Sequence, residues 1–370
     1  MNEPERSARL AGPVRVVGAG LLGASIGLAL CAHGVDVILD DASPSALDLA
    51  IDYGAGRRAA VGDAPVLVVV CVPPDVTAPL IERELAAHPD AVVTDVASVK
   101  LEPFLALQRR GVDLTRYIGS HPLSGRERGG AISARADLFY GRPWVICRDA
   151  ETPGWALGLV EDLALDLGST PLEMTPEEHD RSVALVSHVP QVVASLLAAR
   201  LIDAPEIAVA LAGQGVRDTT RIASSDPSLW LQILRANAEP VVEVLRDLSR
   251  DLDTVVAALT SINSEGEATP GTRRAIADAI AAGNAGVARL PGKHGQNRRF
   301  VTLTVMVDDT PGALGRLLTE LGEIGVNMED LRLEHSPGAQ IGFAEIAVVP
   351  EVKQRAIDDL VARGWRIAGL

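Results

Sequence analysis

The sequence predicts an α/β protein of three domains: a parallel-sheet domain over residues 13–174, an all-helical domain over residues 175–290 and a small α+β module over residues 299–370. Short β-branched runs alternate with helical patterns through the first half, which is typical of βαβ units around a parallel sheet. After Thr175 apolar residues recur at helical spacing, and from Phe300 onward strand and helix patterns alternate again. These changes of pattern set the expected domain boundaries.

Composition and charge argue against several classes of function. The chain of 370 residues is 47% hydrophobic, 22% charged and only 3% aromatic, so aliphatic residues must fill the cores of an ordinary globular protein. Its net charge is −15 and none of the three expected domains carries a net positive charge, which argues against binding to nucleic acid or to anionic membranes. Cys31, Cys71 and Cys147 form no CxxC pair, so we expect neither a disulfide framework nor a cysteine-ligated zinc site. No signal peptide is read and the apolar stretch Leu21–Ala32 is too short to cross a membrane, so we expect a cytoplasmic protein.

The first domain is expected to begin with a βαβ unit. Val14–Val17 reads as a strand, Leu21–His33 as a helix and Val35–Leu39 as a second strand. Two prolines close the apolar run Val66–Val72, as expected of a central strand that is buried on both faces. Further strands are expected at residues 91–94, 117–119, 144–147 and 171–174.

The rest of the chain is expected to form helices and then a small sheet. Apolar residues from Val183 to Leu197 and from Trp230 to Val255 predict helices that are long enough to pair between two subunits. A glycine-rich, basic linker follows at residues 283–299. The C-terminal module is expected to have the order βαββαβ. Its strands are expected at 300–307, 326–335 and 343–348, and its helices at 311–325 and 352–363.

A glycine pattern after the first strand predicts a dinucleotide site. Residues 18–23 read GAGLLG, a GxGxxG motif between a strand and a helix. The first glycine suits a tight turn, the second allows close approach of a pyrophosphate, and the third allows close packing of helix on strand. The free N–H groups of the helix then favour phosphate. The residues expected to contact the cofactor here are Gly18, Gly20, Leu22 and Gly23.

The end of the second strand indicates which dinucleotide binds. Asp40 and Asp41 follow the motif by about 20 residues, where a carboxylate accepts hydrogen bonds from the adenosine ribose. We expect Asp41 to fill this role and to favour NAD over NADP, because its charge repels a 2′-phosphate. Val72 and Pro73, at the end of a later strand, are expected to contact the cofactor on its nicotinamide side.

Two loops bring candidate catalytic residues to the same edge of the sheet. DVASVK at residues 95–100 and SHPLSG at residues 120–125 each follow a strand. His121 is the best candidate for a general base, because imidazole titrates near neutrality and can take a proton from a substrate hydroxyl. Ser98 is a candidate to hydrogen-bond that ring. A solvated loop residue is the alternative for His121 and for Lys100.

The helical domain holds a candidate carboxylate clamp. Arg217 and Arg221 are four residues apart, which predicts one helix face, and arginine pairs with carboxylates through two parallel hydrogen bonds. Pairing with nearby aspartates or with solvent is the alternative. His179 and His188 are nine residues apart, a spacing that does not suit metal ligation on one helix face, so no metal is expected.

Together these motifs resemble the prephenate dehydrogenase family. The matching patterns are GxGLxGxS at 18–25, DxxSVK at 95–100, SHPLSGRE at 120–127, HDxxxxxVSHVP at 179–190 and RDxTRIAxSDPxLW at 217–230. The resemblance implies an α/β domain of the Rossmann type and a helical dimerisation domain. It also implies NAD-dependent oxidative decarboxylation of prephenate to 4-hydroxyphenylpyruvate in tyrosine biosynthesis, by a homodimer.

The same resemblance implies roles for individual residues. His121 takes the proton of the substrate ring hydroxyl, supported by Ser98, and Arg221 pairs with a substrate carboxylate with help from Arg217. The residues implied to line the pocket are Glu127, His188 and Gln191. Better-studied members of the family have a second histidine at the position of Gln191. Arogenate, with an amino group in place of the keto group, is therefore an alternative substrate.

The C-terminal module resembles an ACT domain. DTPGAL at residues 309–314 and GVNM at residues 325–328 match that family's ligand-binding turn and strand. The resemblance implies that L-tyrosine or another aromatic amino acid binds there and inhibits, and a dimerisation module without a ligand is the alternative. The residues implied to bind the effector are Asp309, Pro311, Gly312, Leu314 and Asn327.

Two further functions are weighed against this one. A dehydrogenase of the 3-hydroxyacid type would need a helical lysine base, whereas the only lysines are Lys100, Lys293 and Lys353. An amino-acid sensor with a degenerate dehydrogenase half would give no NADH when substrate and NAD⁺ are supplied.

Overall fold

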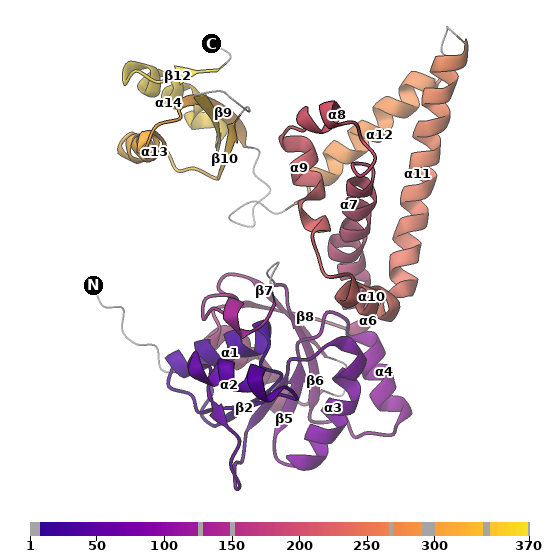
Figure 1. Ribbon diagram of the computed structural model, residues 1–370, viewed down its shortest axis with the longest axis vertical. Coiled ribbons are helices and arrows are strands. Elements are labelled where there is room, and N and C mark those ends of the chain that lie inside the picture. The colour runs from indigo at the N-terminus through magenta and orange to yellow at the C-terminus, as the bar shows by residue number, and fades with distance from the viewer. Residues whose placement is uncertain are drawn as a thin grey trace. The chain divides into compact units, whose positions relative to one another are not determined.

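The computed structural model describes residues 8–124, 129–148, 152–265, 270–290, 300–335 and 341–368 (Figure 1). Contacts divide the chain into two compact units. The first comprises Met1–Asp203 with Thr220–Asp247, and the second comprises Ala204–Thr219 with Leu248–Leu370. The boundary falls inside the segment that was expected to be one helical domain, within the long helix α11 (Ala238–Glu265).

An eight-stranded sheet lies at the centre of the first unit, in the order β3-β2-β1-β4-β5-β6-β7-β8. Its strands are β1 (Val14–Val17), β2 (Val37–Asp40), β3 (Arg57–Arg58), β4 (Leu67–Val70), β5 (Val92–Asp95), β6 (Tyr117–Pro122), β7 (Pro143–Cys147) and β8 (Thr170–Met174). All neighbours pair in parallel except β6 and β7, which are antiparallel with Gly119 opposite Cys147. The expected parallel-sheet domain is therefore present, with one antiparallel pair where β7 joins β6. In the described residues between these strands the chain forms only the short helix η1 (Ala131–Ser133), not the long crossover that a parallel neighbour needs.

Helices cover both faces of this sheet (Figure 1). α1 (Leu21–Ala32), α2 (Pro44–Asp52) and α5 (Gly154–Asp166) pack on one face, whereas α3 (Pro74–Ala87) and α4 (Leu101–Arg109) pack on the other. Strand residues alternate between the two cores. On β4, Leu67 and Val69 join the α1 side, and Val68 and Val70 join the α3 side. Burial on both faces explains the unbroken apolar run in the sequence.

A continuous helical run follows the sheet. α6 (Pro176–Val183) begins at Thr175, which forms a capping box with Glu178, and one π-helical turn, η2 (Ala184–His188), joins it to α7 (Val189–Ala199). The run spans 24 residues and contains an 18-residue window with a mean hydropathy of 1.6, of which 33% is buried, so by length and composition it could cross a membrane. Core helices of soluble proteins meet the same criterion, so this is weak evidence for a membrane span. The short helix η3 (Arg221–Ala223), α10 (Pro227–Ala236) and the start of α11 also belong to this unit.

The second unit contains α8 (Glu206–Ala210), α9 (Gln214–Thr220), most of α11 and α12 (Thr272–Val287). An apolar stripe on α11 is exposed along one helix face. It consists of Leu248, Leu252, Val256 and Leu259, which are 41%, 60%, 52% and 53% exposed. Their spacing of three or four residues places them on one face, and such a stripe fits the expected pairing of helices between subunits.

The C-terminal module is a four-stranded antiparallel sheet in the order β10-β11-β9-β12. Its elements are β9 (Val301–Asp308), α13 (Ala313–Glu323), β10 (Asp330–His335), β11 (Ile341–Val348), α14 (Pro350–Ala362) and β12 (Arg366–Ile367). The expected order βαββαβ is present. β10 begins at Asp330 rather than at Val326, which is buried beyond the end of α13.

A buried ion pair on α3 predicts a large difference between two neighbouring glutamates. The carboxylate of Glu84 is 2% exposed and accepts hydrogen bonds from Arg15 at 2.8 Å and from Arg83 at 2.7 Å. Glu82 makes an exposed pair with Arg110 at 2.7 Å. We expect Glu84→Met to lower the free energy of unfolding by about 3 kcal/mol, because Arg15 loses a buried partner and keeps only Asp40.

The matched control is Glu82→Met, for which we expect a loss of less than about 1 kcal/mol. Urea denaturation of both variants measures the difference. Equal losses would contradict the assignment of a stabilising role to the buried pair.

Candidate active site

The glycine turn after β1 lies against the end of β4. Gly18 has φ +102°, and a Cβ atom there would stand 2.3 Å from the carbonyl oxygen of Cys71. A Cβ atom at Gly23 would stand 1.9 Å from the carbonyl oxygen of Gly18, so α1 can pack on the turn only without a side chain there. Gly20, the N-cap of α1, has open space where its Cβ would be. This open backbone at a helix N-terminus fits the phosphates of a dinucleotide.

The other residues predicted for the cofactor lie around this turn. Leu22 is half-buried against the core on the α1 side. A Val72 methyl carbon lies 3.1 Å from the position that a Gly18 Cβ would take, and Pro73 is exposed at the start of α3. The ends of β1 and β4 are therefore neighbours at the edge where the motif predicts the cofactor.

The two aspartates after β2 have different surroundings. Asp41 accepts hydrogen bonds from the backbone N–H of Ala19 at 2.6 Å and of Ser43 at 2.7 Å, so its carboxylate lies beside the glycine turn. Asp40 instead pairs with Arg15 at 2.6 Å and with Arg83 at 3.5 Å. The position of Asp41 suits hydrogen bonding to a ribose, whereas the carboxylate of Asp40 already pairs with two arginines.

His121 lies near the end of β6, and its ring contacts a second histidine from α6. Nδ1 of His121 is 2.9 Å from Nε2 of His179, and the two rings meet edge to face with centroids 5.1 Å apart. Nδ1 of His179 is in turn 2.7 Å from Oδ1 of Asp180. Three side chains from two elements thus form one hydrogen-bonded chain.

Asp180 is held by the start of α4. Its Oδ1 accepts the backbone N–H of Lys100 at 2.9 Å, and its Oδ2 accepts that of Leu101 at 3.0 Å. Its backbone carbonyl accepts a hydrogen bond from the Asn237 side chain at 2.8 Å. A buried carboxylate at a helix N-terminus is stabilised both by these N–H groups and by the helix dipole.

The surroundings of His121 favour its neutral form. Burial lowers the pKa of His121 well below its usual range, and the nearby His179, Lys100 and His188 act in the same direction. The pKa is therefore lower than the near-neutral value expected from the sequence. A histidine must be neutral to act as a general base, so this environment keeps His121 able to accept a proton at lower pH.

Ser98 and Lys100 lie between β5 and α4. Ser98 is half-buried, and in the described residues it makes no hydrogen bond to His121, so its assigned role stays a prediction. Lys100 is fully buried rather than solvated, and its ammonium group pairs with Asp95. Asp95 also accepts a hydrogen bond from the Tyr117 hydroxyl at 2.8 Å.

His188 and Gln191 lie on consecutive turns of the helical run. Burial lowers the pKa of His188 to about 4, and its Nδ1 is 3.0 Å from the side-chain nitrogen of Asn237. Gln191 is 7% exposed, and its amide lies between the hydroxyls of Ser195 and Ser225, each at 3.4 Å. The π-helical turn η2 ends at His188, and such turns often occur at functional sites.

The expectation that the two arginines share one helix face is wrong. α9 ends at Thr220, and Arg221 begins the separate helix η3, because the end of the helix tightens into a 3₁₀ turn. Arg217 belongs to the second unit and Arg221 to the first. Both are exposed, and neither makes an ion pair with any residue that the structure describes. Glu127, also expected in the pocket, lies outside the described residues.

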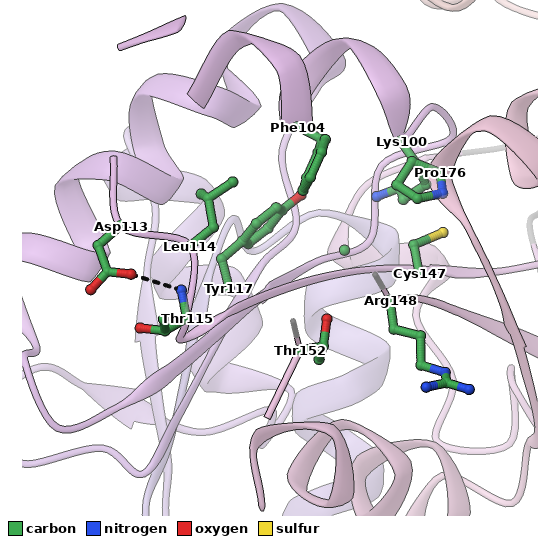
Figure 2. Close-up of a pocket in the computed structure, with 11 residues that line it drawn as sticks. Lys100, Phe104, Asp113, Leu114, Thr115, Tyr117, Cys147, Arg148, Thr152 and Pro176 are labelled. Atoms are coloured by element: carbon green, nitrogen blue, oxygen red, sulfur yellow. Dashed lines mark hydrogen bonds between the residues drawn. The ribbon is translucent and has the colours of Figure 1, made fainter. Parts of the chain in front are cut away.

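A pocket of about 120 Å³ lies beside this network. Lys100, Phe104, Tyr117 and Cys147 line it, and His121 does not. Figure 2 shows Lys100 and Cys147 at one end of the pocket and Asp113 at the other. The pocket is therefore distinct from the edge that carries the glycine turn.

Sequence reasoning missed His179, Asp180 and Asn237 as parts of the site. The signal was an adjacent His-Asp pair at a helix whose start follows the sheet, but its partner His121 is 58 positions away. In the part of the chain that the structure describes, no group of three or more metal-ligating side chains could hold a metal ion.

Comparisons with known proteins match both the sheet domain and the helical segment that follows it. The model of the prephenate dehydrogenase nucleotide-binding domain matches residues 26–171, and that of the prephenate dehydrogenase dimerization domain matches residues 175–268. A probable prephenate dehydrogenase of Streptomyces niveus is 36% identical over 95% of this chain and 98% of its own length. A cyclohexadienyl dehydrogenase of Zymomonas mobilis is 30% identical over 67% of this chain and 88% of its own length.

Solved structures give the same result. Prephenate dehydrogenase of Aquifex aeolicus, in complex with hydroxyphenyl propionate and NAD⁺, is 25% identical with a TM-score of 0.64, over 75% of this chain and 99% of that one. Arogenate dehydrogenase of Synechocystis is 26% identical with a TM-score of 0.60, over 74% of this chain and 99% of that one. The family expected from the motifs is confirmed, and so are the Rossmann-like NAD-binding domain and the dehydrogenase class. The chain belongs to the prephenate dehydrogenase family.

Proposed function

We propose that this protein catalyses the NAD⁺-dependent oxidative decarboxylation of prephenate to 4-hydroxyphenylpyruvate, in tyrosine biosynthesis in the cytoplasm. The observation that supports it best is the position of His121, half-buried and neutral near the end of β6, at the sheet edge that also carries the glycine turn. Gly18, Gly20, Gly23 and Asp41 would hold the dinucleotide, with Leu22, Val72 and Pro73 beside them. The carboxylate of Asp41 favours NAD⁺ over NADP⁺.

The chemistry assigns one task to each group. NAD⁺, when bound, accepts the hydride from the ring carbon that bears the hydroxyl. His121 removes the hydroxyl proton, so the carbon–oxygen bond becomes a conjugated carbonyl. This carbonyl receives the electron pair of the breaking bond to the carboxylate, and CO₂ leaves as the ring becomes aromatic. Arg221 binds a substrate carboxylate with help from Arg217, and Ser98 supports the base.

Arogenate is the second candidate substrate, because the side chain of Gln191 can hydrogen-bond either to a keto group or to an ammonium group. Its amide carries both donor and acceptor groups, and the two serine hydroxyls beside it can each donate or accept. The amide can therefore present its N–H₂ to a keto group or its oxygen to an ammonium group. Parallel steady-state assays that follow NADH at 340 nm with each substrate test the proposal, and no NADH with either would reject it.

The protein is proposed to be a homodimer. The exposed stripe on α11 supports this assembly, as does the match of residues 175–268 to a dimerization domain. The substrate is a small molecule, and neither nucleic acid nor a membrane is proposed as a partner.

The base assignment predicts a loss of turnover in His121→Asn. We expect kcat to fall by about 10²–10⁴-fold with little change in the Kd for NAD⁺, because general-base catalysis is lost while the glycine turn is intact. In the wild type, the acid limb of kcat/KM should lie below pH 6.5, because burial lowers the pKa of His121. A variant with near-normal kcat would remove His121 from this role.

The clamp assignment predicts that Arg221→Ala raises KM for the substrate at least tenfold. Loss of a charged hydrogen-bonded partner costs on the order of 2 kcal/mol or more. Arg221→Lys should recover only part of the affinity, because lysine lacks the planar fork. The control is Arg200→Ala, another exposed arginine of the helical segment. Equal KM values in all these variants would place the carboxylate site elsewhere.

The C-terminal module is proposed to bind an aromatic amino acid. The turn at Asp309–Gly312 precedes α13, whose free N–H groups suit a ligand carboxylate; Leu314 lies in the first turn of α13, and Asn327 follows the helix. We expect L-tyrosine to inhibit the wild type and Asn327→Ala to weaken that inhibition without changing basal kcat. Asn327 is preferable to Gly312 for the test because Gly312 has φ +89°, where any side chain strains the backbone. Unchanged, purely competitive inhibition in Asn327→Ala would place the effect in the active site.

A further inference from the structure

We propose that His179 and Asp180 act as a positioning pair behind His121. They keep Nδ1 of His121 protonated, leave its Nε2 as the basic atom, and share the positive charge that the base acquires. This inference rests on the proposed role of His121 as the general base. It is carried by the hydrogen-bonded chain from Asp180 through His179 to His121, with distances of 2.7 Å and 2.9 Å.

The positions of the protons in this hydrogen-bonded chain follow from the hydrogen bonds at its Asp180 end. Each oxygen of Asp180 accepts a backbone N–H group at the start of α4, so both oxygens act as acceptors and Asp180 accepts from His179. Neutral imidazole has one N–H group, so His179 donates through Nδ1 and its Nε2 carries a lone pair. That lone pair requires a proton on Nδ1 of His121.

Nε2 of His121 is then the atom that remains basic. No residue in the described parts of the chain hydrogen-bonds to it. The arrangement resembles the logic of a serine hydrolase triad, in which a carboxylate fixes the tautomer of the catalytic imidazole. Here a second imidazole stands between the carboxylate and the base.

The chain can also move charge away from the reacting atoms. When Nε2 of His121 takes the substrate proton, the ring becomes an imidazolium that still donates Nδ1–H to His179. Transfer of that Nδ1 proton to Nε2 of His179 leaves His121 neutral and His179 positive beside Asp180. One proton enters the chain and no other atom changes place.

The local charges favour this transfer. Lys100 and His188 both face His121 and oppose a positive charge on it, as does burial. Burial and the charge of Lys100 also lower the pKa of His179, but the hydrogen bond and charge of Asp180 and the charge of Asp95 act in the opposite direction, and His121 has no carboxylate among the causes of its shift. A positive charge is therefore better tolerated on His179 than on His121.

Nitrogen-15 NMR of the full-length protein, labelled at its seven histidines, tests the tautomer directly. We expect His121 to carry its proton on Nδ1 and to be unprotonated at Nε2, with its signals assigned by their loss in His121→Asn. A wild-type His121 that is protonated at Nε2 would overturn the proposal. This measurement needs neither substrate nor turnover.

Two variants at His179 then separate a positioning role from simple packing. His179→Phe keeps a ring but removes the acceptor, and we expect kcat to fall about 100-fold with KM for NAD⁺ unchanged. His179→Gln can accept the Nδ1 proton through its side-chain oxygen, so we expect it to restore the tautomer and part of kcat. The matched control is His33→Phe, at an exposed histidine after α1, which should behave as wild type.

The outcomes distinguish this inference from the proposed function. Normal kcat in His179→Phe together with a large loss in His121→Asn would overturn the relay and leave the base in place. Normal kcat in His121→Asn would overturn the base assignment, and with it the catalytic part of the relay, whatever tautomer NMR shows. Failure of His179→Gln to recover any of the kcat lost in His179→Phe would also overturn the proposal.

Discussion

The buried carboxylate of Asp180 fixes the centre of the first unit. A carboxylate that is only 2% exposed is costly unless every oxygen is hydrogen-bonded, and Asp180 meets this requirement with groups from separate elements. Its oxygens hold the start of α4 and the ring of His179, and its backbone carbonyl holds Asn237 at the end of α10. Asn237 in turn contacts His188. Asp180 thereby ties the helical run to the start of α4, and it contacts His179 directly and His188 through Asn237.

A second buried carboxylate lies close by and has a different effect. Asp95 at the end of β5 pairs with the ammonium group of Lys100 and also accepts hydrogen bonds from the Tyr117 hydroxyl and the Ala97 N–H. Its charge is paired with that of Lys100 inside the protein. Asp180 has no lysine or arginine partner among the described residues, so its field acts on His179. The charges of both aspartates act to raise the pKa of His179, and Asp180 also hydrogen-bonds its ring.

The sequence predicted what depends on local pattern, and it failed where distant segments meet. The glycine turn, the strand ends and the order βαββαβ follow from residues near one another in the chain. The contact between His121 and His179 depends on how α6 packs against β6, which spacing along one helix cannot reveal. The direction of β7 was missed because a strand pattern carries no direction. The burial of Lys100 excludes the alternative of a solvated loop residue, and the sequence could not exclude it because Lys100 meets its partner Asp95 only in the folded chain.

The charge balance gives a reason for the isolation of Arg221. With 49 acidic residues and a net charge of −15, the protein as a whole repels an anionic substrate. Arginines such as Arg15, Arg57 and Arg83 form ion pairs with carboxylates of the protein itself. In the described residues Arg221 has no such partner, so its guanidinium need not break an existing ion pair before it binds a carboxylate. An acidic enzyme that binds an anionic substrate needs a cationic side chain that is not already held in an internal ion pair. Among the described residues Arg221 meets that condition, and it lies in the first unit beside α7, the helix that carries Gln191.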